Sequence, residues 1–199
     1  NNTAKYWAAF AAQNFAKVIN KNVTFLRNCA EKLGGTMIVH HVQTLIIIRC
    51  EFQHNEAGSV AVFHNIERVL NMMSNYLDNY AAAAKLGNGI VIKDCLDVIH
   101  SRVQFSNNSA RSVGGSLLIR NVHRHRIYFC IFSNNHAQNR GGAMVIIKNN
   151  ITYVNSTKFI SNAALYGGAV VIQNCHQIFF NFLIFKGNTA YSTRKVSQG

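Results

Sequence analysis

The closest grouping among the seven acidic residues is Asp94 with Asp97, followed by a histidine. Asp94, Asp97 and His100 occur together in KDCLDVIH. Clustered carboxylates of this kind bind calcium, or act as general acid and base on a glycosidic bond. Asp94 falls on a polar corner dipeptide and Asp97 on the next turn, however, so turn formation explains both. The Gly-x-Ser-x-Gly and phosphate-loop motifs are absent. We therefore expect no catalytic residue and no cofactor, with a polysaccharide lyase or hydrolase as the residual alternative.

Two histidine pairs have the residue type for metal ligation. His123 and His125 are two residues apart, which on a strand places both side chains on one face, and His40 and His41 are adjacent. Neither pair has a third ligand near it in sequence, and neighbouring arginines discourage a cation. We expect no metal site and assign these histidines to surface or corner positions.

The densest basic run is RNVHRHR, residues 120–126. It belongs to a chain with 20 Lys and Arg against seven Asp and Glu, a net charge of +13. Such a surplus attracts sulfated or uronic glycans and acidic proteins. If the run lies on one edge of the fold, we predict a polyanion-binding site, and a solvated corner is the alternative. The candidate residues are Arg120, Arg124, Arg126, His123 and His125. Nucleic acid is a poor candidate because no helix-turn-helix, zinc finger or aromatic RNA-binding signature is present.

A sequence repeat determines where these residues lie. The element Phe-x-x-Asn recurs with a period of about 27 residues, and Tyr76–Asn79 is a degenerate copy inside the one interval that is twice as long. Its aromatic positions are Phe25, Phe52, Phe105, Phe132, Phe159 and Phe185, and its amide positions are Asn28, Asn55, Asn108, Asn135, Asn162 and Asn188. Glycine pairs follow most copies, at residues 34–35, 114–115, 141–142 and 167–168. Two short apolar runs then precede the next copy.

Three short apolar runs per period, without an amphipathic helix between them, predict an all-β fold. We expect a right-handed parallel β-helix of about seven coils, one coil being a period of roughly 27 residues. Equivalent residues of successive coils then stack, so phenylalanines form an internal column and asparagines an amide ladder. The glycine pairs allow positive φ or close approach of the next coil. The absence of proline agrees, because every strand N–H is needed as a donor.

The first residues allow a second interpretation. WAAFAAQNFAKVI, residues 7–19, has helix-like apolar spacing and many alanines, which favours a helical cap. When the start of the chain is aligned with its C-terminal part, however, Gln13–Asn14 falls on Gln173–Asn174 and Phe25–Asn28 falls on Phe185–Asn188. We therefore interpret this segment as another repeat.

Phe-x-x-Asn followed by Gly-Gly-Ala-aliphatic resembles the repeat of the polymorphic outer membrane proteins, autotransported adhesins of chlamydiae. The fuller form occurs at Gly141–Met144 and Gly167–Val170, whereas Gly34–Met37 and Gly114–Leu117 have Thr or Ser in third place. The resemblance covers nearly the whole chain and implies a right-handed β-helix passenger. It says less about function, because β-helices include adhesins, lyases and structural fibres.

The composition indicates a single domain over residues 1–199, and the chain begins and ends within a repeat, as expected of a window of a longer protein. No apolar run is long enough to span a membrane. Sequons at Asn1, Asn22, Asn107, Asn150 and Asn155 favour an extracellular or cell-surface glycoprotein. The five cysteines fall at phases that separate potential partners by three coils, too far for a disulfide, so we expect small core thiols.

These observations favour a non-enzymatic extracellular structural or adhesive protein. Its expected partners are further copies, assembling into fibres, or other extracellular matrix or surface proteins. The alternative is a binding module for acidic glycans or an acidic partner through basic corners.

Overall fold

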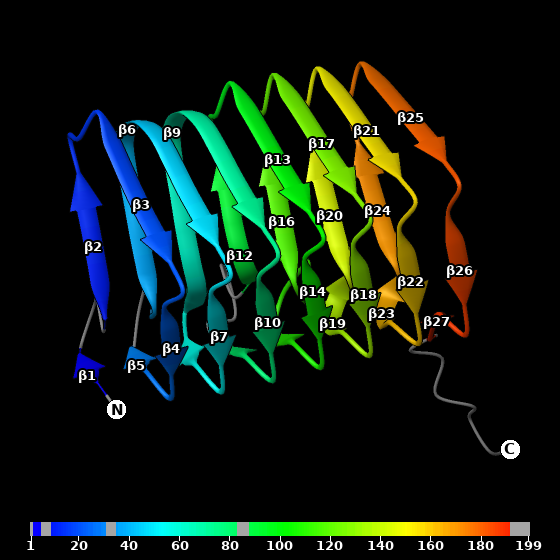
Figure 1. Cartoon of the computed structure of the whole chain (residues 1–199). Coiled ribbons are helices and arrows are strands. Elements are labelled where there is room, and N and C mark those ends of the chain that lie inside the picture. The colour runs from blue at the N-terminus through cyan, green and yellow to red at the C-terminus, as the bar shows by residue number, and fades with distance from the viewer. Residues whose placement is uncertain (1, 5–8, 31–34, 83–87, 192–199) are drawn as a thin grey trace, which may run out of the picture.

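The computed structural model describes residues 2–4, 9–30, 35–82 and 88–191. Within these residues the regular elements are parallel β-strands, stacked coil upon coil into a rod (Figure 1). Three sheets run along the rod. Stacked residues of neighbouring coils, such as Asn108 and Asn135, are one period apart in the sequence. The predicted parallel β-helix is thus confirmed.

The sheet that carries the repeat phenylalanines has seven strands. They are β4 (Thr24–Leu26), β7 (Glu51–Gln53), β10 (Asn75–Leu77), β14 (Gln104–Ser106), β18 (Ile131–Ser133), β22 (Lys158–Ile160) and β26 (Ile184–Lys186).

The sheet that follows the asparagines has eight short strands. They are β1 (Thr3–Ala4), β5 (Cys29–Ala30), β8 (Glu56–Ala57), β11 (Tyr80–Ala81), β15 (Ser109–Ala110), β19 (His136–Arg140), β23 (Ala163–Tyr166) and β27 (Thr189–Ala190).

The third sheet has twelve strands in two rows. The first row comprises β2 (Phe10–Gln13), the first part of β6 (Met37–Ile48), the first part of β9 (Ser59–Met72), β12 (Asn88–Lys93), β16 (Leu117–Arg120), β20 (Met144–Ile147) and β24 (Val170–Gln173). The second row comprises β3 (Lys17–Lys21), the remainder of β6 and β9, β13 (Asp97–Ser101), β17 (Arg124–Tyr128), β21 (Ile151–Asn155) and β25 (Gln177–Asn181). The two expected runs are thus continuous in β6 and β9. Where the rows are separate, as in the coil of β16, β17, β18 and β19, a coil has four strands and not the expected three, because the short strand after the asparagine is added.

The pairing register explains the spacing of the repeat. Phe105 lies beside Phe132, and Phe132 beside Phe159, so each aromatic ring lies on the ring of the next coil. Adjacent ring centroids along the column are 4.4–5.0 Å apart and the rings are nearly parallel. Tyr76 occupies the column between Phe52 and Phe105, as the degenerate copy predicts. The inner residues of the twelve-stranded sheet pack against this column.

A ladder of asparagine amides runs beside the aromatic column. Each Nδ2 donates to the Oδ1 of the next coil's asparagine at 2.9–3.1 Å, from Asn2 through Asn188. The same groups bind main chain: Asn108 Nδ2 donates to the Tyr76 carbonyl, and the Asn79 N–H donates to Asn108 Oδ1. The ladder therefore satisfies backbone groups at a corner that no strand pairs.

An alanine lies two residues after each asparagine and forms a further buried column. Ala57, Ala81, Ala110 and Ala137 are almost completely buried, and their strands pair in register. A larger side chain has no room at this narrow end of the cross-section. The complete repeat is Phe-x-x-Asn-x-Ala, and the fixed alanine is a signal that our sequence analysis missed.

The two glycines of each pair have different roles. Gly141 has a φ of +62°, a backbone conformation that suits a residue without Cβ. Gly142 does not have a positive φ, but a Cβ at this residue would overlap the carbonyl oxygen of Gly168 in the next coil. The first glycine therefore makes the turn and the second allows close stacking. Gly34 lies outside the described residues.

Most corners in the described part of the chain are made by residues other than glycine. Twenty non-glycine residues have positive φ there, in three columns that mark corners of the coil. Asparagine is frequent at these positions, as its tolerance of this conformation predicts, but the columns also include Arg27, Met73 and Phe129.

The N-terminal segment is a repeat. Phe10–Gln13 and Lys17–Lys21 are strands in register with β6, so the helical interpretation of these residues is wrong. Alanine propensity is overridden here by main-chain pairing with the next coil. Trp7 lies outside the described residues.

Candidate functional site

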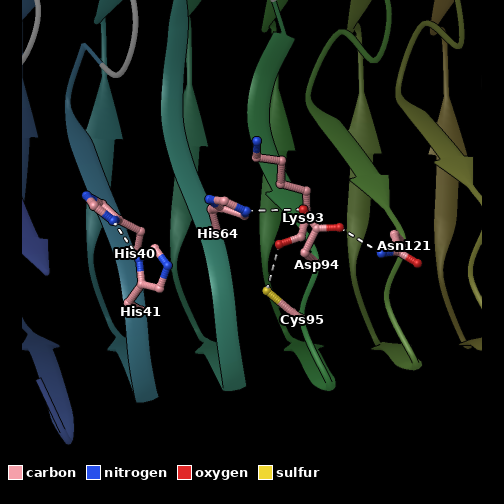
Figure 2. A network of polar contacts seen from close by, with 7 residues as sticks. All are labelled: His40, His41, His64, Lys93, Asp94, Cys95 and Asn121. Carbon is pink, nitrogen blue, oxygen red and sulfur yellow. Dashed lines mark hydrogen bonds and ion pairs between the residues drawn. The ribbon is translucent and has the colours of Figure 1, made fainter. Parts of the chain in front are cut away.

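The corner between the two rows carries a line of polar side chains. Its left-handed residues are Asn14, His41, Asn65, Asp94, Asn121, Lys148 and Asn174. The preceding column, in register, contains His40, His64, Lys93 and Arg120. We call these two columns the row corner. Because they come from successive coils, residues far apart in sequence lie side by side (Figure 2).

Asp94 is the centre of the hydrogen bonding at the row corner. Asn121 Nδ2 donates to Asp94 Oδ1 at 2.7 Å, and His64 Nε2 lies 3.2 Å from Asp94 Oδ2 (Figure 2). The carboxylate is thus held from the coil on either side. In the coil before that of His64, His40 Nδ1 and His41 Nδ1 are 3.0 Å apart, so one of the two nitrogens must carry the hydrogen.

The charge of His64 follows from its surroundings. Burial lowers the pKa of the His64 imidazole, the nearby Lys93 cation lowers it further, and Asp94 opposes both effects. The net direction is downward, so His64 is mainly neutral at pH 7 and donates a hydrogen bond rather than a positive charge. Its contact with Asp94 therefore leaves the carboxylate charge in place.

Three cations line a depression together with this carboxylate. Lys93, Arg120 and Lys148 line a shallow depression together with Asp94 and Asn121. Lys93 and Arg120 are direct register partners, and Lys148 occupies the left-handed position of the next coil. Three positive charges against one negative charge make the depression suitable for a carboxylate or sulfate group.

The predicted five-residue polyanion site is not one surface. Arg120 lies at the row corner, whereas His123 and Arg124 line a second depression with Glu67, Arg68 and other residues at the start of the second row. Arg126 binds Asp97 instead, with its Nη2 2.6 Å from both carboxylate oxygens. The prediction followed proximity in sequence, whereas the corner at residues 121–123 places Arg124 and Arg126 on the second row. His123 adjoins the row corner as well, in a depression that Asp94, Asn121 and Lys148 also line. Lys93 and Lys148, one coil away on each side, were not found.

His125 is a further correction, because its side chain is completely buried. Strand β17 alternates outward and inward, with Arg124 and Arg126 outward and His125 and Ile127 inward. His123 precedes the strand and is exposed. The expectation that His123 and His125 share a face is therefore wrong, since the corner changes the alternation between them.

The buried histidine belongs to an interior polar cluster. The His100 and His125 rings meet edge to face, and Asn71 Nδ2 approaches His100 Nδ1 at 3.3 Å and donates to the Tyr76 hydroxyl at 3.0 Å. Both ring nitrogens of His125 and Nε2 of His100 have no hydrogen-bond partner among the described residues. Burial raises the pKa of the Tyr76 phenol and lowers the pKa of His100 to about 4. Burial also lowers the pKa of His125 well below its ordinary value, and His100 adds to the effect. All of these groups are therefore neutral at pH 7.

The other candidate residues divide between surface and core. The sequons at Asn22 and Asn107 are exposed, those at Asn150 and Asn155 are half-buried, and Asn1 lies outside the described residues. The five cysteines are free thiols. In residues 2–4, 9–30, 35–82 and 88–191, no three or more histidine, cysteine or acidic side chains are grouped as metal ligands. Nor does any helix that could cross a bilayer occur in the described part of the chain.

Comparison with known proteins gives one match. Residues 129–143, from the corner before β18 to the alanine after the glycine pair, match the Chlamydia polymorphic membrane protein repeat. Neither the curated proteins nor the solved structures include a match. The matched family and the β-helix fit a surface protein of the adhesin type, and the family indicates an outer-membrane or surface location. The chain is a repeat β-helix, one segment of which is similar to the chlamydial polymorphic membrane protein repeat.

Proposed function

We propose that this chain is a non-enzymatic rod that displays adhesive surfaces outside the cell. The observation that carries the proposal is the unbroken internal column, in which one aromatic ring from each of seven strands stacks on the next. Because each coil packs only on its neighbours and the same contacts recur, the rod extends without a hinge. A rigid spacer of this kind suits a protein that projects a binding surface.

Assembly of such rods into fibres is the finer part of the proposal. Electron microscopy of the protein purified from its native source tests it directly. Periodic filaments would support a structural polymer. Single short rods at high protein concentration would contradict fibre assembly and leave the adhesive rod.

A second candidate function is the binding of acidic glycans, and the row corner favours it. Lys93, Arg120 and Lys148 are supplied by three successive coils. Lys93 and Arg120 are register partners, so the stacking distance of about 4.8 Å separates their strands, and Lys148 lies in the adjacent corner column of the next coil. A sulfated or uronic chain that lies along the rod would meet one cation per coil. Asp94, with Asn121, would exclude some anions and orient hydroxyl groups by accepting hydrogen bonds.

Binding to heparin at increasing salt tests this second function. Lys93→Gln/Arg120→Gln/Lys148→Gln should weaken binding and reduce its salt dependence, because exposed charge contacts are screened. The matched control is Arg27→Gln/Lys158→Gln/Lys186→Gln, which removes the same charge from the seven-stranded sheet and its corner. Equal weakening by both triple variants would show attraction to net charge alone and would contradict a site at the row corner.

A further inference from the structure

The outward face of the second row is unusually apolar. Its outward side chains form three columns in register, and the column beside the row corner, which begins with Lys17 and Thr44, is mainly polar. The other two columns are Ile19, Ile46, Leu70, Ile99, Arg126, Tyr153 and Phe179, and Lys21, Ile48, Met72, Ser101, Tyr128, Asn155 and Asn181. Nine of these fourteen residues are aliphatic or aromatic. On the seven-stranded sheet the equivalent columns contain only five, which are Leu26, Leu77, Ile131, Ile160 and Ile184. We call the fourteen residues, with the corner column that follows them, the second-row face.

The corner of this face displays large apolar side chains. Met73, Phe129 and Phe182 have left-handed φ values of 51°, 55° and 52°, and 40%, 59% and 85% of their surface is exposed. A bulky residue in this conformation costs free energy that asparagine avoids, and Asn22 occupies the same column in the first coil. Phe129 has complete coils on both sides, so its exposure does not come from the end of the rod. Packing explains neither the residue type nor its position.

Cations border the second-row face on both sides. Lys17, Arg68 and Arg124 lie along the edge next to the row corner, and Lys21, Arg49 and Arg102 lie along the opposite edge. All six are exposed. Two acidic residues lie at the edge next to the row corner: Asp97, which Arg126 binds, and Glu67, which lines a depression with Arg68 and Arg124. The face is thus an apolar band between two positive edges.

This charge pattern decides what covers the face. A second copy of the chain would bring positive edges against positive edges, and the net charge of +13 opposes that contact further. The face is one side of a continuous parallel sheet, and the depressions found on the described part of the molecule lie at its edge or elsewhere. Its strand N–H and C=O groups are already paired between coils, so it cannot bind a peptide by adding a strand. A planar surface with negative charge and an apolar layer beneath it fits the apolar band, the two positive edges and the sheet whose main-chain groups are already paired.

We propose that the second-row face binds peripherally to an anionic phospholipid surface. Phe129, Phe182 and Met73 enter the boundary between headgroups and acyl chains, and the aliphatic columns lie against it. The bordering lysines and arginines contact the headgroup charges, to which they are attracted within a Debye length. The rod then lies flat on the membrane without crossing it. This proposal does not rest on glycan binding, because the row corner is a separate surface.

Vesicle flotation of the 199-residue protein tests the proposal. The protein is expected to float with vesicles of phosphatidylcholine and phosphatidylserine at low salt, and to remain in the dense fraction with phosphatidylcholine alone. High salt should release it. Binding to neither vesicle, or equal binding to both, would overturn the proposal.

Two variants separate the apolar and the charged contributions. Phe129→Asn/Met73→Asn places a residue suited to positive φ at both corners and should lower the partition coefficient roughly tenfold. Arg49→Gln/Arg102→Gln should lower it roughly 25-fold, since each cation near an anionic surface is worth about 1 kcal/mol. The matched controls on the seven-stranded sheet and its corner are Leu26→Asn/Ile131→Asn and Arg27→Gln/Lys186→Gln, for which the losses should be much smaller. Circular dichroism verifies that each variant is folded.

Two results would exclude lipid binding through this face, and the second would also assign the face another role. If both face variants float as the parent does, lipid contact through this face is excluded. If the parent ignores vesicles but forms a dimer in sedimentation velocity that Phe129→Asn/Met73→Asn abolishes, the face is a contact between copies.

Discussion

The imidazole rings of His100 and His125 lie edge to face, with centroids 5.6 Å apart, and both side chains are completely buried inside the rod. Both are neutral because burial lowers their pKa values, to about 4 for His100 and well below the ordinary value for His125. In the unfolded chain each imidazole binds a proton near its ordinary pKa of 6.5. The unfolded state therefore gains protons that the folded state does not accept between pH 6.5 and about 4.

We expect the free energy of unfolding to be at its full value above pH 6.5 and to fall as the pH is lowered toward 4. At 1.36 kcal/mol for each pKa unit, His100 alone contributes a loss of about 3 kcal/mol. His125→Val, which copies Val98 at the paired position, should reduce this loss of unfolding free energy at low pH. Urea denaturation at about pH 7.5 and about pH 5 measures it. An unchanged difference between the two pH values in the variant would show that His125 does not contribute.

The amide ladder predicts that substitutions at two neighbouring asparagines differ greatly in their effect on the free energy of unfolding. Asn108→Ala removes the partners of the Asn79 N–H and the Tyr76 carbonyl, and breaks two amide contacts. We expect a loss of about 3–5 kcal/mol, because the stranded groups are buried. Asn107→Gly changes an exposed residue at φ +56° and is the matched control, with an effect below about 1 kcal/mol. Chemical denaturation measures both variants, and similar losses would contradict the ladder's role.

A glycine needed for close stacking and a glycine at a corner with positive φ should respond differently to substitution. Gly142→Ala should strongly destabilise the protein or prevent folding, because the new methyl group overlaps the main chain of the next coil. Gly187→Asn should be nearly neutral, since Asn107 and Asn134 occupy the same corner with the same sign of φ. Thermal unfolding compares the two. A stable Gly142→Ala protein would mean that the coils can separate at this point.

Thiol reactivity should divide the five cysteines into two groups. Burial raises the pKa of Cys95 to about 11 and that of Cys130 to about 12, and Cys50 is equally inaccessible. Cys29 and Cys175 are half-buried. At pH 8 iodoacetamide should therefore modify Cys29 and Cys175 in the folded protein, and the other three after unfolding. Mass spectrometry counts the labels, and rapid labelling of Cys130 in the native state would show that the coil opens.

The sequence predicts the fold well because stacking forces the same residue types to recur. Phe132 and Asn135 identify their columns at once, and even Tyr76 is found by interval alone. The corners are less predictable. Any residue that tolerates positive φ serves there, so Met73 and Phe129 leave no signal of their own.

The candidate site is harder to predict because its residues come from different coils. Lys93, Arg120 and Lys148 are each about one period apart in the sequence and meet only after register is known. Arg120 and Arg126 are close in sequence but lie on opposite sides of a corner. The inward direction of His125 also depends on that corner, which no alternation rule locates from one sequence.

The direction of the hydrogen bonds has a mechanical consequence. Strands lie across the rod, so the main-chain bonds that join Phe105 to Phe132 and their equivalents point along its axis (Figure 1). Tension along that axis loads the interfaces between coils in series, and the weakest one opens first. Each opening releases one coil, about 27 residues or roughly 90 Å of extended chain, while the remaining coils stay folded. The molecule would lengthen in regular steps under load and absorb work at each one.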